Sequence, residues 1–127
     1  MSSGALEFPA IAVVYARFIA LTSLSADLGG QLLLYIGLDP EGIAVAMASN
    51  VAGAASLGLE SDVGRAKEAL RAGVCDFLVN SLDEALRILK NEIRSRRPVS
   101  VVLAVYVPPI WTHPEEVTGT SYEPMVS

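Results

Sequence analysis

The strongest constraint in this sequence is a regular alternation, from Gln31 onward, between short apolar runs and stretches with helical spacing. Four runs rich in Leu, Val and Ile, at residues 31–38, 55–60, 74–79 and 99–107, predict buried strands. The intervening stretches at 40–54, 61–72 and 81–97 predict helices. Strands that are joined by helices of this length pair in parallel through right-handed crossovers.

Local signals at the ends of these stretches support the helices. Asp39 suits an N-cap, Pro40 suits the first helical position, and Ser81 with Glu84 forms a capping box. Gly73 marks the end of the second helix. We therefore expect an α/β fold in residues 29–107, a small Rossmann-like parallel sheet of about four strands with crossover helices.

The two ends of the chain give weaker signals. Residues 1–28 form an N-terminal extension in which 10–26 suits either a helix or an additional strand. Residues 108–127 contain several prolines and predict an extended arm that is ordered only where it packs on something. Trp111 and Tyr122 in this arm are candidates to anchor it on a neighbouring subunit, because aromatic residues supply much of the energy of interfaces.

Composition narrows the class of protein. Hydrophobic residues make up 52% of the 127 residues, charged residues make up 18%, and the mean hydropathy is +0.47. This is apolar for a lone domain, so we expect a homo-oligomer that covers part of the apolar surface. The longest apolar stretch, residues 10–24, contains Arg17 and is shorter than the roughly 20 residues of a membrane span. With no signal peptide evident, we expect a cytoplasmic protein without a membrane segment.

Charge and reactive residues exclude further classes. The net charge of −5 argues against nucleic acid as a partner. The single cysteine, Cys75, and the single histidine, His113, leave no multi-cysteine or histidine-based metal site. Cys75 lies in an apolar run, where a cysteine is usually an inert hydrophobe. A basic cluster is expected in the later part of helix 81–97, where cations complement the helix dipole: Arg87, Lys90, Arg94, Arg96 and Arg97.

The candidate site is the turn between the first strand and the first helix, IGLDPEG at residues 36–42. In parallel α/β sheets a ligand lies outside the carboxyl ends of the strands, with phosphate at the N-terminus of the first helix. An acid at the end of the second strand accepts hydrogen bonds from a ribose diol, and Glu60 follows Gly37 by 23 residues, the usual spacing. The cofactor-binding candidates are Gly37, Leu38, Asp39, Gly42 and Glu60.

Residues 37–86 also resemble, without a gap, the NAD-binding domain of urocanase (urocanate hydratase). The next strand of that family resembles PVSVVL at 98–103, so the likeness covers roughly residues 29–103. It rests on the joint spacing of Gly37-Leu38, Gly42, Ala44, AGAAS (52–56), Leu57, Glu60, Arg65, Leu70-Arg71, Asp76 and LDEAL (82–86).

The resemblance implies a site for NAD, which urocanase holds tightly and uses as an electrophile to add water to urocanate. The family pattern has glycines at positions 37, 39, 40 and 42, and this chain has Asp39 and Pro40 at the middle pair. A carboxylate about 4 Å from a phosphate is repelled by about 4 kcal/mol at an effective dielectric of 20, whereas a helix terminus attracts by about 0.3–1 kcal/mol. An N-cap Asp also occupies the amides that a phosphate would use.

We therefore expect Asp39 to replace the phosphate and the dinucleotide site to be vestigial, with no cofactor, or NAD as the alternative ligand. The predicted role is a non-catalytic module that binds a nucleotide or small anion, or that promotes oligomerisation. The alternative is the NAD-binding component of a urocanate hydratase-like lyase that another chain completes, because this chain lacks room for the other parts of urocanase. Two acids could instead have purely structural roles: Glu60 could cap the next turn, and Asp76 could pair with Arg71 or cap a loop.

Overall fold

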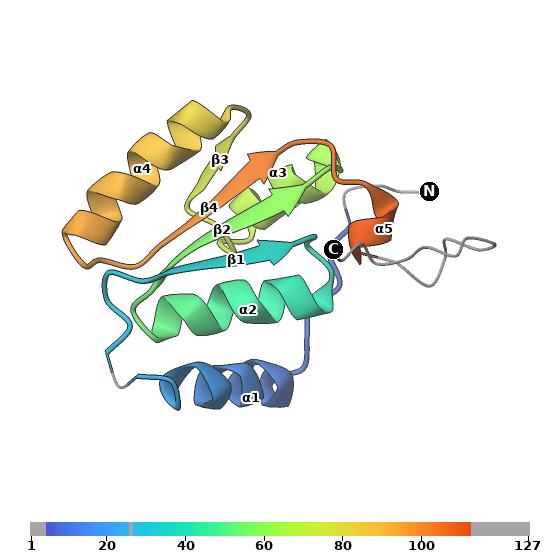
Figure 1. The fold of residues 1–127 in the computed structure, drawn as a ribbon. Helices are drawn as coiled ribbons and strands as arrows, with labels where there is room; N and C mark the ends of the chain where they lie inside the picture. Colours follow the sequence, from blue (N-terminus) through green and yellow to red (C-terminus); the bar gives the residue numbers. More distant parts are fainter. Residues whose placement is uncertain (1–4, 26, 113–127) are drawn as a thin grey trace, which may run out of the picture.

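Four parallel strands form the centre of the protein, in the order β1-β2-β4-β3 (Figure 1). In the computed structural model, which describes residues 5–25 and 27–112, the strands are β1 (Leu32–Ile36), β2 (Ala55–Glu60), β3 (Phe77–Val79) and β4 (Val99–Ala104). All three neighbouring pairs are parallel. The predicted Rossmann-like α/β fold is confirmed.

Three crossover helices connect these strands, and each begins within two residues of its predicted start. They are α2 (Pro40–Val51), α3 (Val63–Arg71) and α4 (Leu82–Arg94). The side chains of Asp39, Asp62 and Ser81 cap them, each accepting a hydrogen bond from the backbone N–H three residues later. Local capping chemistry therefore fixes the starts of all three helices.

Several predicted elements are longer than the observed ones. The first strand stops at Ile36 because Gly37 turns the chain with a φ of 89°. The third strand begins only at Phe77, since the amides of Val74 and Cys75 still donate to Ala69 O at the end of α3. The fourth strand ends at Ala104. The helices likewise stop earlier than predicted, by one to three residues.

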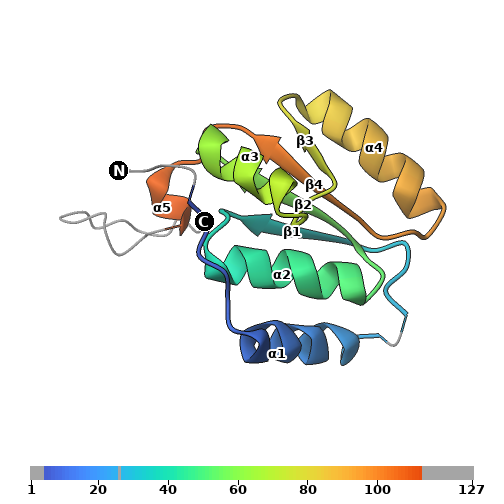
Figure 2. The same ribbon diagram turned by 180° about the vertical axis from the view of Figure 1, so that it is seen from behind.

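The helices cover both faces of the sheet (Figure 2). Helices α2 and α3 pack on one face, where Tyr35, Ile43, Ala66 and Val102 belong to one buried cluster. Helix α4 packs on the other face, where Leu89 joins a second cluster with side chains of β2, β3 and β4. The sheet is thus buried on both sides over β2 and β4, as expected for parallel strands.

The N-terminal extension contains a helix, α1 (Ile11–Thr22), and not an additional strand. Helix α1 packs on the outer side of α2, and none of its own residues is buried. Arg17 of α1 forms an ion pair with Glu41 at the start of α2. Helix α2 therefore lies between the sheet and α1. At the other end, the part of the arm that is described forms a short helix, α5 (Pro109–Thr112), whereas His113 and Tyr122 lie outside the described residues.

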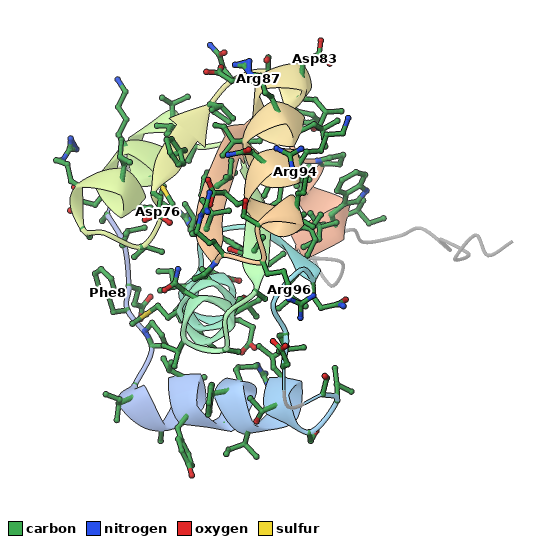
Figure 3. The ribbon with its side chains drawn as sticks, turned by 90° about the vertical axis from the view of Figure 1, so that its left-hand side faces the viewer. Phe8, Asp76, Asp83, Arg87, Arg94 and Arg96 are labelled. Carbon is green, nitrogen blue, oxygen red and sulfur yellow. The ribbon has the colours of Figure 1, made fainter. Side chains whose placement is uncertain are left out.

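One charge prediction is wrong. Arg96 and Arg97 were expected within the last turns of a helix, but α4 ends at Arg94, and Figure 3 shows Arg96 well separated from Arg87 and Arg94. Arg96 has a φ of 59° and donates to the Asp27 carboxylate at 2.8 Å, while Arg97 donates to Glu92 at 2.8 Å. These two side chains therefore belong to the connection after α4, where each pairs with a carboxylate.

Candidate cofactor site

The candidate site lies at the carboxyl ends of β1 and β2, as the sequence predicts for this fold. A cavity of about 200 Å³ opens there, between the β1–α2 turn and the residues that follow β4. Its lining consists of Gly37, Asp39, Leu59, Glu60, Ser61, Arg65, Val107 and Pro109. The structure therefore brings three of the five predicted site residues to one cavity. Leu38 and Gly42 complete the same turn but do not line the cavity.

Two glycines define the backbone of the turn. Gly37 has a φ of 89°, a conformation that L side chains rarely adopt, and its amide donates to Leu59 O of β2 at 2.8 Å. A Cβ at Gly42 would lie 1.9 Å from Gly37 O. No side chain fits at position 42, so this glycine allows the start of α2 to approach the end of β1 closely.

Asp39 occupies the N-terminus of α2 with its own charge. Its Oδ1 accepts a hydrogen bond from the Gly42 N–H at 2.8 Å. Pro40, at the first helical position, has no N–H to offer. The amide that a phosphate at this helix end would use is therefore already bonded to a carboxylate.

Glu60 supplies a second carboxylate to the same turn. The residue is only 5% exposed, and its Oε1 accepts from the Leu38 N–H at 2.6 Å. Its Oε2 accepts from the Asp62 N–H at 2.9 Å. Both oxygens are thus engaged by backbone amides, one in each of two neighbouring strand-to-helix turns. The sequence suggested that Glu60 could cap the next turn, but it gave no sign of the bond to Leu38.

Arg65 is the charged residue among the five lining residues that were not predicted for this site. It is the one basic side chain among the described residues that line the cavity, and it forms no ion pair with a described residue. A signal was available, since Arg65 belongs to the spacing that resembles urocanase. Arg65, Asp39 and Glu60 all line this cavity, so its described lining contains one basic and two acidic residues.

Asp76 and Cys75, the two other candidate residues from the sequence, do not line this cavity and have structural roles. Asp76 Oδ2 accepts from the Ser100 N–H of β4 at 2.9 Å and so links the residue before β3 to β4, while Arg71 pairs with Glu68. Cys75 is buried, and burial together with the nearby Asp76 raises the pKa of its thiol to about 11. Such a thiol is protonated at neutral pH and is a poor nucleophile.

The described residues contain neither a cluster of metal ligands nor a helix that could span a membrane. Within residues 5–25 and 27–112, no three side chains of His, Cys, Asp or Glu gather closely enough to hold a metal ion. In the same ranges, every helix is too short or too polar to cross a bilayer.

The fold defines a Rossmann-like α/β domain, in which carboxylates of the protein accept hydrogen bonds from amides of the β1–α2 turn. Residues 13–121 match the family model of the urocanase Rossmann-like domain. The chain therefore belongs to the urocanase family through this domain. The match is wider than the resemblance seen in the sequence, because it includes most of α1 and all of α5.

Proposed function

We propose that this chain is a non-catalytic module of the urocanase family in which Asp39 and Glu60 close the former dinucleotide site. The observation that carries the proposal is the pair of hydrogen bonds from the amides of Gly42 and Leu38 to these carboxylates. In a working site of this fold, free amides at the same turn would face the pyrophosphate.

Electrostatics and space both support this proposal. Each carboxylate near a bound phosphate adds a repulsion of about 4 kcal/mol at 4 Å and an effective dielectric of 20. Arg65 offsets part of this repulsion, but it is a single cation against two anions. The cavity of about 200 Å³ is also smaller than the roughly 300–1,000 Å³ of typical ligand sites. A small anion that contacts Arg65 fits this space better than a dinucleotide does.

The role of the module is then association with other copies of this chain. Between α1 and α2 lies a groove of about 280 Å³ that is lined by Ile11, Val14, Tyr15, Phe18, Ala48 and Val51, with no charged residue. Ile11 and Val51 are 85% and 71% exposed. For a chain with a net charge of −5, an uncharged apolar surface is the region where two copies meet with the least repulsion.

Calorimetric titration with NAD tests the closed site. The natural protein is expected to bind NAD no more tightly than about 100 µM, because the carboxylates repel the pyrophosphate. The double variant Asp39→Gly, Pro40→Gly, which restores the glycines of the family pattern, is expected to bind at least tenfold more tightly. Asp62→Gly, at the cap of α3, is the matched control and leaves NAD affinity unchanged. Micromolar affinity in the natural protein would contradict the proposal.

A second candidate function is the NAD-binding component of a urocanate hydratase-like lyase that another chain completes. The observation that favours it is the family match, which spans the whole turn and Glu60. Native mass spectrometry of freshly purified protein separates the two functions. Retained NAD supports the lyase component, whereas a ligand-free homo-oligomer supports the closed module.

A further inference from the structure

Among the residues that the structure describes, β1 is an edge strand that pairs only with β2. Gln31 O accepts from Ala55 N at 2.9 Å, and Gly37 N donates to Leu59 O at 2.8 Å, so these residues face β2. In a parallel pair, alternate residues face the partner strand, which means that Leu32, Leu34 and Ile36 direct their N–H and C=O groups away from the sheet. These outward groups can pair only with something beyond β1.

The side chains of the same residues leave an apolar surface uncovered. Leu32 is 44% exposed and Leu34 is 60% exposed, although their register partners Ala55 and Leu57 are buried under α4. Natural sheet edges are usually protected by charges, prolines, bulges or short strands. The sequence of β1, LLLYI, has no charge and no proline. At the opposite edge, β3 has only three residues.

We propose that the C-terminal segment, residues 113–127, adds an antiparallel strand to β1. The segment starts in the right place, because α5 ends at Thr112 near the carboxyl ends of the strands (Figure 1). Val107 and Pro109, just before this point, line the same cavity as Gly37 and Asp39 at the end of β1. A chain that leaves this corner and follows β1 must run antiparallel to it.

The length and composition of the segment fit this role. Its 15 residues span about 50 Å when extended at roughly 3.3 Å per residue, and the five residues of β1 require only about 17 Å. Pro114 and Pro124 enclose a stretch without proline, residues 115–123. This stretch contains VTGTSY, in which Val, Thr and Tyr favour strands. Glutamates at both of its ends would give the new edge the charges that β1 lacks.

Hydrogen exchange of single amides, followed by NMR, tests the pairing. In the full chain the amides of Leu32, Leu34 and Ile36 are expected to exchange slowly. In a variant that ends after Thr112, the same amides are expected to exchange at least tenfold faster. The amides of Leu33 and Tyr35, which face β2, remain protected in both proteins and report that the sheet is still folded. Fast exchange at Leu34 in the full chain would overturn the inference.

A second experiment keeps the whole chain, in case the shortened variant does not fold. Thr118→Pro and Gly119→Pro each prevent a regular strand in the segment, and either one is expected to accelerate exchange at Leu34 at least tenfold. The matched control Val126→Pro lies outside residues 115–123 and leaves exchange unchanged. If slow exchange at Leu34 survives truncation but is lost on dilution, a second copy of the chain pairs with β1. That result would overturn the inference. None of these readouts depends on NAD, so the outcome is independent of the proposed function.

Discussion

The β1–α2 turn and the β2–α3 turn cap the helices that follow them in nearly the same way. In each turn an aspartate at the N-cap accepts a hydrogen bond from the amide three residues later, from Gly42 to Asp39 at 2.8 Å and from Arg65 to Asp62 at 3.1 Å. Glu60 then bonds to an amide in each of the two turns. In its polar contacts, the β1–α2 turn is therefore an ordinary capped helix start.

The two turns differ in their backbones. Only the β1–α2 turn has a positive φ, at Gly37, and only there does a glycine stand where a Cβ would meet a carbonyl oxygen at 1.9 Å. Close approach of this kind is what a dinucleotide-binding turn requires. The β1–α2 turn thus combines a glycine backbone that allows close approach with amides at Leu38 and Gly42 that are bonded to carboxylates of the protein, the combination on which the proposed function rests.

Substitution of Gly42 should lower the free energy of unfolding the most, because no side chain fits between the start of α2 and Gly37 O. We expect Gly42→Ala to destabilise the protein by about 3 kcal/mol, since the new methyl group forces α2 away from Gly37. Gly53→Ala is the control: Gly53 also has a positive φ, but it has open space around it, so the cost is about 1 kcal/mol. Urea denaturation measures both. Equal losses would mean that close approach in the β1–α2 turn is not needed for folding.

Removal of the Glu60 carboxylate, which bonds to both turns, should lower the free energy of unfolding by an intermediate amount. Glu60→Ala leaves the amides of Leu38 and Asp62 without their partner, at an expected cost of about 2 kcal/mol. Glu68→Ala removes an exposed acid that pairs with Arg71, and we expect a change below about 0.5 kcal/mol. Thermal denaturation of both variants compares them. A neutral Glu60→Ala would show that the link between the two turns contributes nothing.

Substitution of the two N-cap aspartates should lower the free energy of unfolding the least, and by similar amounts. Asp39→Ala and Asp62→Ala are each expected to cost about 1 kcal/mol, and Asp39→Asn only a few tenths, because asparagine also caps helices well. Chemical denaturation in parallel resolves these differences. If Asp39→Ala instead stabilised the protein, Asp39 would be under electrostatic strain, as expected for a site kept ready for a ligand.

The sequence predicted the parts of this structure that local chemistry determines. Asp39 and Ser81 start their helices as predicted, because a cap depends on residues only three positions apart. The bond between Glu60 and Leu38 joins residues 22 apart, and it exists only because Ile36 and Leu59 are in register across β1 and β2. No pattern within the sequence encodes that register.

Two further differences between the predictions and the structure also arise from contacts between distant parts of the chain. Residues 11–22 are apolar on several sides, so periodicity could not separate a helix from a strand, and the packing of α1 on α2 decides it. The later basic residues were assigned to a helix because their spacing continues that of α4. A left-handed residue, Arg96, ends that continuation, and its guanidinium pairs with Asp27 from a distant part of the chain.

The most direct test of the closed site is an NMR titration of the natural protein with NAD that follows the amide resonances of Leu38 and Gly42. If Glu60 and Asp39 hold these amides, neither resonance approaches saturation at NAD concentrations up to about 100 µM. Saturable shifts of both resonances at micromolar NAD would mean that the dinucleotide displaces the two carboxylates, which would contradict the proposed function.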